Sequence, residues 1–155
     1  MKILLAVDDS PYSSEAVGAV ANRPWPKGTT VRVLSAVETV PPPAAELWYD
    51  AGGQLERMHQ ELTKRAEGLT SRVARALSTS GLPAEPLVRQ GDARSVIVDE
   101  AKAWSADLIV LGSHGYTGFQ RWLLGSVAQS VVSHAPCSVE VVRRKLVESG
   151  ETKPS

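Results

Sequence analysis

Apolar residues follow two patterns along the chain. Short apolar runs are typical of strands, and runs that are apolar on both faces, such as 2–7 and 107–112, are typical of strands buried in a parallel sheet. Between the runs, apolar residues recur every three or four positions, which predicts amphipathic helices. The predicted strands span residues 2–7, 30–37, 86–90, 107–112 and 138–143. The predicted helices begin near Pro11, Gln54, Asp92 and Gly125.

The order of these elements predicts the fold class. Strands that alternate with helices imply right-handed crossovers and one parallel sheet. We therefore expect an α/β fold: a single-domain, open, five-stranded parallel sheet with helices on both faces, which is a Rossmann-like arrangement. Ligands of such sheets bind beyond the carboxyl ends of the strands, where the strand order reverses. The domain should span residues 1–145, and the polar residues 146–155 should form a flexible tail.

Local signals mark one helix start and one irregular segment. Ser10 followed by Pro11 is a preferred start for the first helix. Residues 38–53 contain three consecutive prolines and a closing Gly-Gly, so we expect an irregular segment with at most a short helical turn. Trp48 and Tyr49 within it belong either to a lid or contact surface, or to a partly packed loop.

Composition and charge narrow the classes of partner. The 155 residues suffice for one domain with a sizeable core. Seventeen Lys and Arg residues balance 17 Asp and Glu residues, and the isoelectric point lies near 6.8, so nucleic acid is not expected as a partner. The apolar runs are far shorter than the ~18 residues that span a membrane, and no secretory signal pattern opens the chain. The single cysteine, Cys137, excludes an internal disulfide, so we expect a cytoplasmic protein.

The stretch from residue 112 to residue 126, GSHGYTGFQRWLLGS, holds the strongest candidate for a binding site. Its glycine spacing differs from the dinucleotide fingerprint, and no lysine follows its last glycine as a P-loop requires. Gly125 and Ser126 nevertheless open a predicted helix, whose first N–H groups can bind an anion. Together with a side-chain-free turn at Gly115, this helix start could hold a phosphate chain. The alternative is a plain surface turn, with Gly125 serving only close packing.

At these residues the chain resembles the universal stress proteins. Nucleotide-binding members of that family carry G-x2-G-x9-G-[ST], and the sequence has Gly112, Gly115, Gly125 and Ser126 at that spacing. The opening VDDS and the closing LLGSVAQSVVSHAPCSVEVVR also resemble family segments. The likeness covers about residues 2–143 and implies an adenine nucleotide alpha hydrolase-like fold. The departures from common family residues spare the glycines; they are Tyr116, Gln129 and Ser138.

The resemblance implies an ATP-binding regulatory module for stress responses, with ATP or a related adenine nucleotide as cofactor and with Mg²⁺ or Mn²⁺ as its companion through the phosphates. Adenosine would lie at the ends of the first two strands, bordered by Ala6, Val7, Asp8 and Val37. Ribose and phosphates would be held by Gly112, His114, Gly115, Gly125, Ser126, Val127 and Ala128. Family members frequently have a basic residue at the position of Tyr116, where it can neutralise phosphate charge. In this chain the nearest basic candidate for that role is Arg121.

Catalytic residues and a protein-held metal are not expected. The P-loop lysine and a clear water-activating base are lacking, which favours binding over turnover. The alternatives are a slow ATPase or phosphotransferase, and a dimeric scaffold of the same fold that binds no nucleotide.

The last predicted strand, SVEVVR at 138–143, should form an edge of the sheet. Val139, Val141 and Val142 give it apolar character on both sides, and its unpaired backbone groups favour association. The family resemblance also implies a homodimer through antiparallel contact of this strand across a two-fold axis. The alternative is a monomer in which a loop or the C-terminal tail shields the edge.

Several other side chains have alternative explanations. Asp8 either contacts the nucleotide or its metal, or only caps the following turn. His114 either bonds a ligand or lies in solvent. Ser113 beside His114 suggests a nucleophile, but we expect that adjacent residues do not face one another. His134 and Cys137 have a ligand-like spacing, but two candidates make a poor zinc site, so Cys137 should be a small buried hydrophobe.

Overall fold

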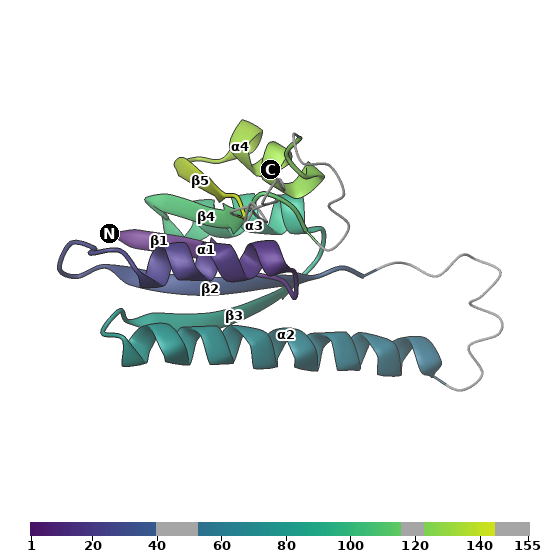
Figure 1. Ribbon diagram of the computed structural model, residues 1–155. Coiled ribbons are helices and arrows are strands. Elements are labelled where there is room, and N and C mark those ends of the chain that lie inside the picture. The colour runs from purple at the N-terminus through teal and green to yellow at the C-terminus, as the bar shows by residue number, and fades with distance from the viewer. Residues whose placement is uncertain (40–52, 116–122, 145–155) are drawn as a thin grey trace, which may run out of the picture.

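The computed structural model describes residues 1–39, 53–115 and 123–144, and it confirms the predicted fold class. Five parallel strands form one open sheet between two layers of helices (Figure 1). The elements in chain order are β1 (Lys2–Ala6), α1 (Pro11–Ala21), β2 (Thr30–Val37), α2 (Gln54–Thr79), β3 (Ala84–Gln90), α3 (Ala93–Trp104), β4 (Leu108–Gly112), α4 (Ser126–His134) and β5 (Ser138–Val142).

The element boundaries agree closely with the sequence pattern. β3 begins earlier than predicted, because Ala84 already pairs with Val31 of β2 and Pro86 is tolerated in a strand at the edge of the sheet. Several expectations lie outside the described residues. They concern the irregular segment with Trp48 and Tyr49, the positions Tyr116 and Arg121, and the tail at 146–155.

The strand order positions the functional end of the sheet. The strands lie in the order β3-β2-β1-β4-β5, with β3 and β5 as edges. In the centre, Leu5 of β1 lies beside Val33 of β2 and beside Val110 of β4. The order reverses between β1 and β4, so their connections depart in opposite directions and leave a crevice at the carboxyl ends. The edge position predicted for β5 is confirmed.

Both faces of the sheet are covered, which explains why β1 and β4 are apolar on both sides. On one face, Ile3 and Leu5 pack beneath α1 and α2. On the other face, Leu4, Leu34 and Ile109 pack beneath α3 and α4. All five side chains are fully buried, and burial of such a side chain stabilises a fold by about 1.5–3 kcal/mol.

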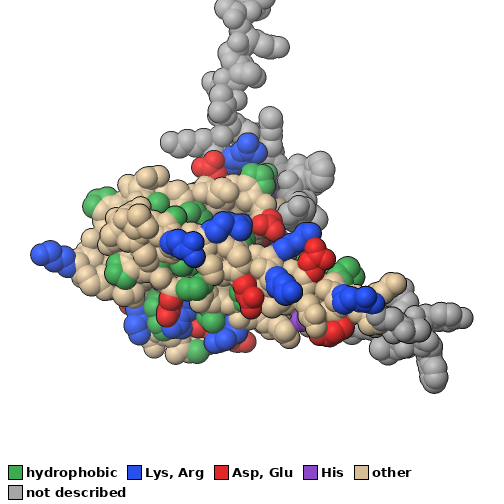
Figure 2. Space-filling model, turned by 90° about the horizontal axis from the view of Figure 1, so that it is seen from below, with side chains coloured by type: hydrophobic (Ala, Val, Ile, Leu, Met, Phe, Trp, Pro, Cys, Tyr) green, Lys and Arg blue, Asp and Glu red, His purple; other side chains and the backbone are tan. Residues whose placement is uncertain are grey.

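The surface on the side of α2 carries charges of both signs. Figure 2 shows Lys and Arg side chains interspersed with Asp and Glu side chains on this face. A continuous basic stripe of the kind that tracks a phosphate backbone is not seen on the face shown. Of the helices in the described ranges, none has the length and apolar character needed to cross a membrane.

Candidate functional site

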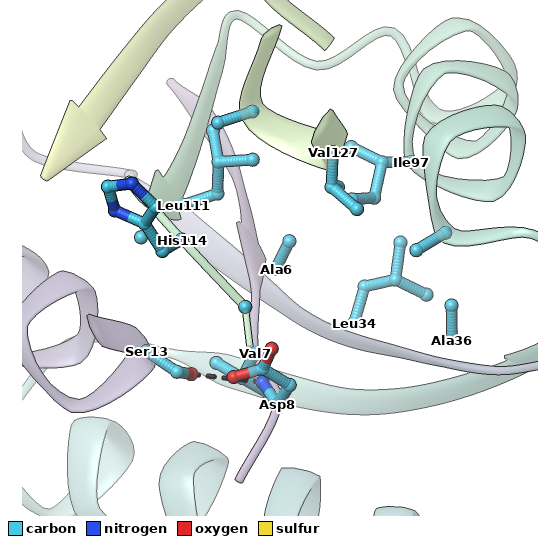
Figure 3. Close-up of a pocket in the computed structure, with 14 residues that line it drawn as sticks. Ala6, Val7, Asp8, Ser13, Leu34, Ala36, Ile97, Leu111, His114 and Val127 are labelled. Atoms are coloured by element: carbon cyan, nitrogen blue, oxygen red, sulfur yellow. Dashed lines mark hydrogen bonds between the residues drawn. The ribbon is translucent and has the colours of Figure 1, made fainter. Parts of the chain in front are cut away.

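A pocket opens at the carboxyl ends of β1, β2 and β4, where the strand order reverses (Figure 3). The starts of α1, α3 and α4 surround it. This is the place at which open α/β sheets hold ligands. The pocket is lined by Ala6, Val7, Asp8, Ser13, Leu34, Ala36, Ala93, Ile97, Leu111, Gly112, His114, Gly115, Val127 and Ala128.

One side of the pocket is apolar. Leu34 and Ala36 lie on the same face of β2, because side chains two positions apart along a strand share a face. Ile97 of α3 and Val127 of α4 lie close to one another across from them (Figure 3). A flat ring placed against these side chains would gain roughly 25 cal/mol for each Å² of apolar surface removed from water.

The polar side of the pocket is built by the turn between β1 and α1. Ser10 caps α1 as predicted, since its Oγ accepts a hydrogen bond from the Ser13 N–H at 3.2 Å. The Ser10 N–H donates to Asp8 Oδ1 at 2.9 Å, and the Asp8 N–H donates to Ser13 Oγ at 3.0 Å. Asp8 therefore caps the turn and also lines the pocket, so the two roles considered for it are compatible.

Close packing explains two glycines of the 112–126 stretch. A Cβ on Gly112 would come within 2.7 Å of backbone atoms of Tyr12 in α1. A Cβ on Gly125 would come within 3.1 Å of the Ser113 carbonyl oxygen, which already accepts a hydrogen bond from the Gly125 N–H at 2.8 Å. The structure thus supports the close-packing alternative for Gly125 and extends it to Gly112.

Gly115 differs from these two glycines because the atom nearest to a Cβ on it belongs to a pocket side chain. That Cβ would lie 3.3 Å from Asp8 Oδ2. None of the glycines at 112, 115 and 125 has a positive φ, so the missing side chains provide space and not left-handed backbone. At Gly115 the free space lies beside the carboxylate of Asp8.

Helix α4 begins at the pocket wall. Gly125 is its N-cap and Ser126 its first residue, and within the described ranges no side chain bonds to its first N–H groups. The first turn of a helix leaves these N–H groups without intrahelical partners, and Val127 and Ala128 of this turn line the pocket. Together with the helix dipole, such groups can bind an anion.

The contact between Ser113 and His114 corrects our expectation that these neighbours do not face one another. Ser113 Oγ lies 3.0 Å from His114 Nδ1, because the alternation of side chains ends with β4 at Gly112. Ser113 is only 2% exposed, which leaves its hydroxyl out of reach as a nucleophile. The serine therefore orients the imidazole.

His114 is half-buried, so the solvent-exposed alternative is wrong. Its ring lies 5.0 Å from the ring of Tyr12, measured between centroids. In the described part of the chain, His114 Nε2 is the buried side-chain polar atom that lacks a hydrogen-bond partner. Buried polar atoms are normally paired, so this nitrogen is an exception among the described residues.

Most residues predicted from the sequence meet in this pocket. Those that line it are Ala6, Val7, Asp8, Gly112, His114, Gly115, Val127 and Ala128. Gly125 and Ser126 adjoin it at the start of α4. Val37 does not line this pocket: it lines a second hollow beside α2, which shares Asp8 and Ala36 with the first.

Several residues that line the pocket are not predicted from the sequence; they are Ser13, Leu34, Ala36, Ala93, Ile97 and Leu111. Leu34 and Ala36 could have been found by following the alternation along β2 to its carboxyl end. Ile97 lies in the core beneath α3, and no local pattern distinguishes a pocket residue there from a core residue. Ser13 carries no pattern of its own, since its position depends on the turn that Asp8 and Ser10 form.

A metal site is not found among the described residues, where no three His, Cys, Asp or Glu side chains gather. His134 Nδ1 lies 2.8 Å from the Ser130 carbonyl oxygen instead. Cys137 packs partly buried against the core beneath α4, and this burial raises the pKa of its thiol. The hydrophobic role expected for Cys137 agrees with that packing.

Comparison with known proteins gives the relatives of the chain. A sequence profile of the universal stress protein family matches residues 1–143. A universal stress protein of Thermus aquaticus is 32% identical over 142 residues, with 91% of this chain and 97% of that protein covered. The structure of UspA from Lactobacillus plantarum is 26% identical, with a TM-score of 0.77 and coverage of 92% of this chain and 97% of that one. A universal stress protein family member of Arabidopsis thaliana, solved with AMP bound, is 18% identical, with a TM-score of 0.65 and coverage of 98% and 97%.

Proposed function

Because the chain belongs to the universal stress protein family, we propose that it binds ATP or a related adenine nucleotide in the pocket at the carboxyl ends of β1, β2 and β4. The position of the pocket, at the reversal of strand order, supports this proposal. A relative with the same fold that was solved with AMP bound supports it further. The protein then acts as a nucleotide-dependent regulatory module in a stress response.

The apolar side of the pocket suits the adenine ring. Leu34, Ala36 and Ile97 offer a surface without charge, against which a flat heteroaromatic ring can be buried. Ala6 and Val7 border the same region from the end of β1. Small side chains at positions 6 and 36 leave the room that such a ring needs.

We expect the phosphates to bind at the start of α4, which no side chain caps within the described ranges. Its N–H groups lie at residues 126–128, of which Val127 and Ala128 line the pocket. Backbone N–H groups with the positive end of a helix dipole behind them stabilise phosphate oxygens. The Ser126 hydroxyl adds a donor. A divalent cation such as Mg²⁺ or Mn²⁺ would be held chiefly by the phosphates.

Binding is favoured over turnover. None of the described residues that line the pocket is a lysine or arginine that could neutralise a transferring phosphoryl group. Backbone N–H groups stabilise the bound nucleotide, and they do not activate a water molecule. A steady-state phosphate-release assay on the purified protein distinguishes this regulatory module from a slow ATPase or phosphotransferase.

The experiment that tests the binding proposal is calorimetric titration of ATP into the wild type and Gly115→Val. Among the described residues, a Cβ at 115 comes near only the end of the Asp8 side chain, which can move, whereas a Cβ at 125 comes near backbone. The fold should therefore survive in Gly115→Val, while ATP affinity should fall at least tenfold. Gly68→Val in α2 is the matched control, because its Cβ meets only the end of Arg72 at 3.5 Å. Equal ATP affinity in a folded Gly115→Val would reject the placement.

We also propose that the protein forms a homodimer through residues 138–143. β5 is an edge strand of the sheet, and its partly buried valines give it an apolar character. Parallel sheets with an open, apolar edge tend to associate along it. The partners of the chain on this proposal are an adenine nucleotide and a second copy of itself.

A further inference from the structure

The turn between β1 and α1 leaves one hydrogen-bond donor and one acceptor unused. Three bonds close the turn, and they occupy Asp8 Oδ1, the Ser10 hydroxyl as an acceptor, and the Ser13 hydroxyl as an acceptor. Within the described ranges, no bond uses Asp8 Oδ2 or the hydrogen of the Ser13 hydroxyl. A serine hydroxyl can donate one bond while it accepts another. Ser13 therefore retains a donor and Asp8 an acceptor.

Both unused groups belong to side chains that line the pocket. Ser13 is only 5% exposed, and it is one of the residues that line the pocket. Figure 3 shows Ser13 reaching from α1 toward Asp8, at the end of β1. Asp8 Oδ2 lies on the side of Gly115, 3.3 Å from where a Cβ would stand. The donor and the acceptor are thus neighbours on one wall of the pocket.

An adjacent donor and acceptor match a ligand hydroxyl better than a phosphate oxygen. A hydroxyl accepts from Ser13 and donates its own hydrogen to Asp8 Oδ2, so both unused positions are filled. A phosphate oxygen accepts from Ser13 but has no hydrogen for Asp8, and its charge is repelled by the carboxylate. Between the sugar hydroxyls and the phosphates of a nucleotide, the chemistry of this wall therefore favours a hydroxyl.

We infer that Ser13 is a specificity-determining residue, which donates a hydrogen bond to a ribose hydroxyl that in turn donates to Asp8, and so favours ribonucleotides over deoxyribonucleotides. This inference rests on the proposed adenine nucleotide binding. Ser13 positions the sugar and takes no part in any bond-breaking step. The turn that holds Ser13 also caps α1, so the sugar contact is made to a hydrogen-bonded part of the fold.

The test is a cycle of protein and ligand changes measured by calorimetry. ATP, 2′-deoxy-ATP and 3′-deoxy-ATP are titrated into the wild type, Ser13→Ala and Ser14→Ala. Ser14 is the matched control, because it is the next residue of α1 and is exposed. In the wild type, removal of the hydroxyl that contacts Ser13 should weaken binding roughly three- to tenfold, the loss expected for one buried hydrogen bond. In Ser13→Ala the same deoxy analogue should bind about as well as ATP, whereas Ser14→Ala should behave as the wild type.

The outcomes separate this inference from the proposed function. If the wild type binds none of the three nucleotides, the proposed function fails and the inference fails with it. If the wild type binds ATP and both deoxy analogues equally, no hydroxyl is selected and the inference alone is overturned, whatever the variant does. If Ser13→Ala weakens all three ligands by the same factor, the serine only supports the turn and the inference is again overturned. Loss of the discrimination in Ser13→Ala alone supports it.

Discussion

At the scale of single residues, the shape of the site depends on where side chains are missing and why. Gly112 and Gly125 allow β4 and α4 to lie close to neighbouring backbone, so these two glycines are needed for packing. Gly115 lies beside the side chain of Asp8, which can move, so its missing side chain affects the pocket more than the packing of the backbone. The motif therefore combines two packing glycines with one that leaves space beside a pocket side chain.

This division predicts that Gly112→Ala destabilises the protein in the absence of any nucleotide. Its Cβ would stand 2.7 Å from the Tyr12 backbone, which cannot move without shifting α1. Overpacking of this kind costs about 1–3 kcal/mol of unfolding free energy. Urea denaturation measures the loss, with Gly18→Ala as the control, since a Cβ there meets its nearest neighbour at 3.9 Å. Equal unfolding free energies for Gly112→Ala and Gly18→Ala would show that this explanation of Gly112 is wrong.

At the scale of elements, the start of α3 is fixed beside the pocket by a charged cap. Asp92 accepts a hydrogen bond from the Arg94 N–H at 2.8 Å, and its carboxylate also contacts the Arg94 guanidinium. The side-chain and backbone hydrogen bonds from Arg94 lower the pKa of Asp92 from its usual 3.8 to about 2. Ala93 and Ile97, which follow this cap, line the pocket. The cap thus holds two lining residues in place.

A depressed carboxyl pKa predicts stability that depends on pH. Asp92 stabilises the folded state above about pH 4, and this contribution should disappear as the pH falls from about 4 to about 2. Asp92→Asn keeps a capping side chain but has no charge to lose. The difference in unfolding free energy between wild type and Asp92→Asn, measured in urea at pH 5, 4, 3 and 2, should therefore shrink across that window. A difference that stays constant from pH 5 to pH 2 would mean that the charge of Asp92 does not support the helix.

At the scale of the whole molecule, β5 is the edge on which assembly depends. The Val142 carbonyl oxygen accepts a hydrogen bond from the Ser113 N–H at 2.9 Å, so the groups of Val142 face β4. By the alternation along a strand, the N–H and C=O groups of Val139 and Val141 then face outward. Glu140, between these valines, is paired with Arg23 beside α1, which neutralises the one charge near the centre of the strand. A second copy can therefore add its own strand to this edge.

The dimer proposal predicts a particle of twice the 16.6 kDa chain mass in light scattering at micromolar concentration. Val141→Lys should shift that mass toward one chain, because a two-fold axis brings like charges of the two copies close together. Val132→Lys in α4 places the same side chain at an exposed apolar position away from β5, and it should remain a dimer. A wild-type mass of one chain would contradict the dimer. An unchanged dimer in a folded Val141→Lys would show that the interface does not lie on this strand.

The sequence predicted the fold more completely than the site, for a physical reason. The period of the apolar residues is a local property, so the strands, helices and the β5 edge could be predicted from it. The packing role of Gly112 depends on Tyr12, which is distant in sequence, and no local pattern reveals it. The resemblance to universal stress proteins supplied Asp8 and His114, but not Ser13, whose role depends on the hydrogen bonds of the folded turn.

The central claim is that an adenine nucleotide occupies the pocket between the end of β1 and the start of α4. Its most direct test is a titration of ATP into isotopically labelled protein, followed through the amide shifts in heteronuclear NMR spectra. We expect the largest amide shifts at Asp8, at 112–115 and at 125–128, and only small amide shifts in α2. Saturating ATP that leaves these amides unshifted, or that shifts mainly the amides of α2, would contradict it.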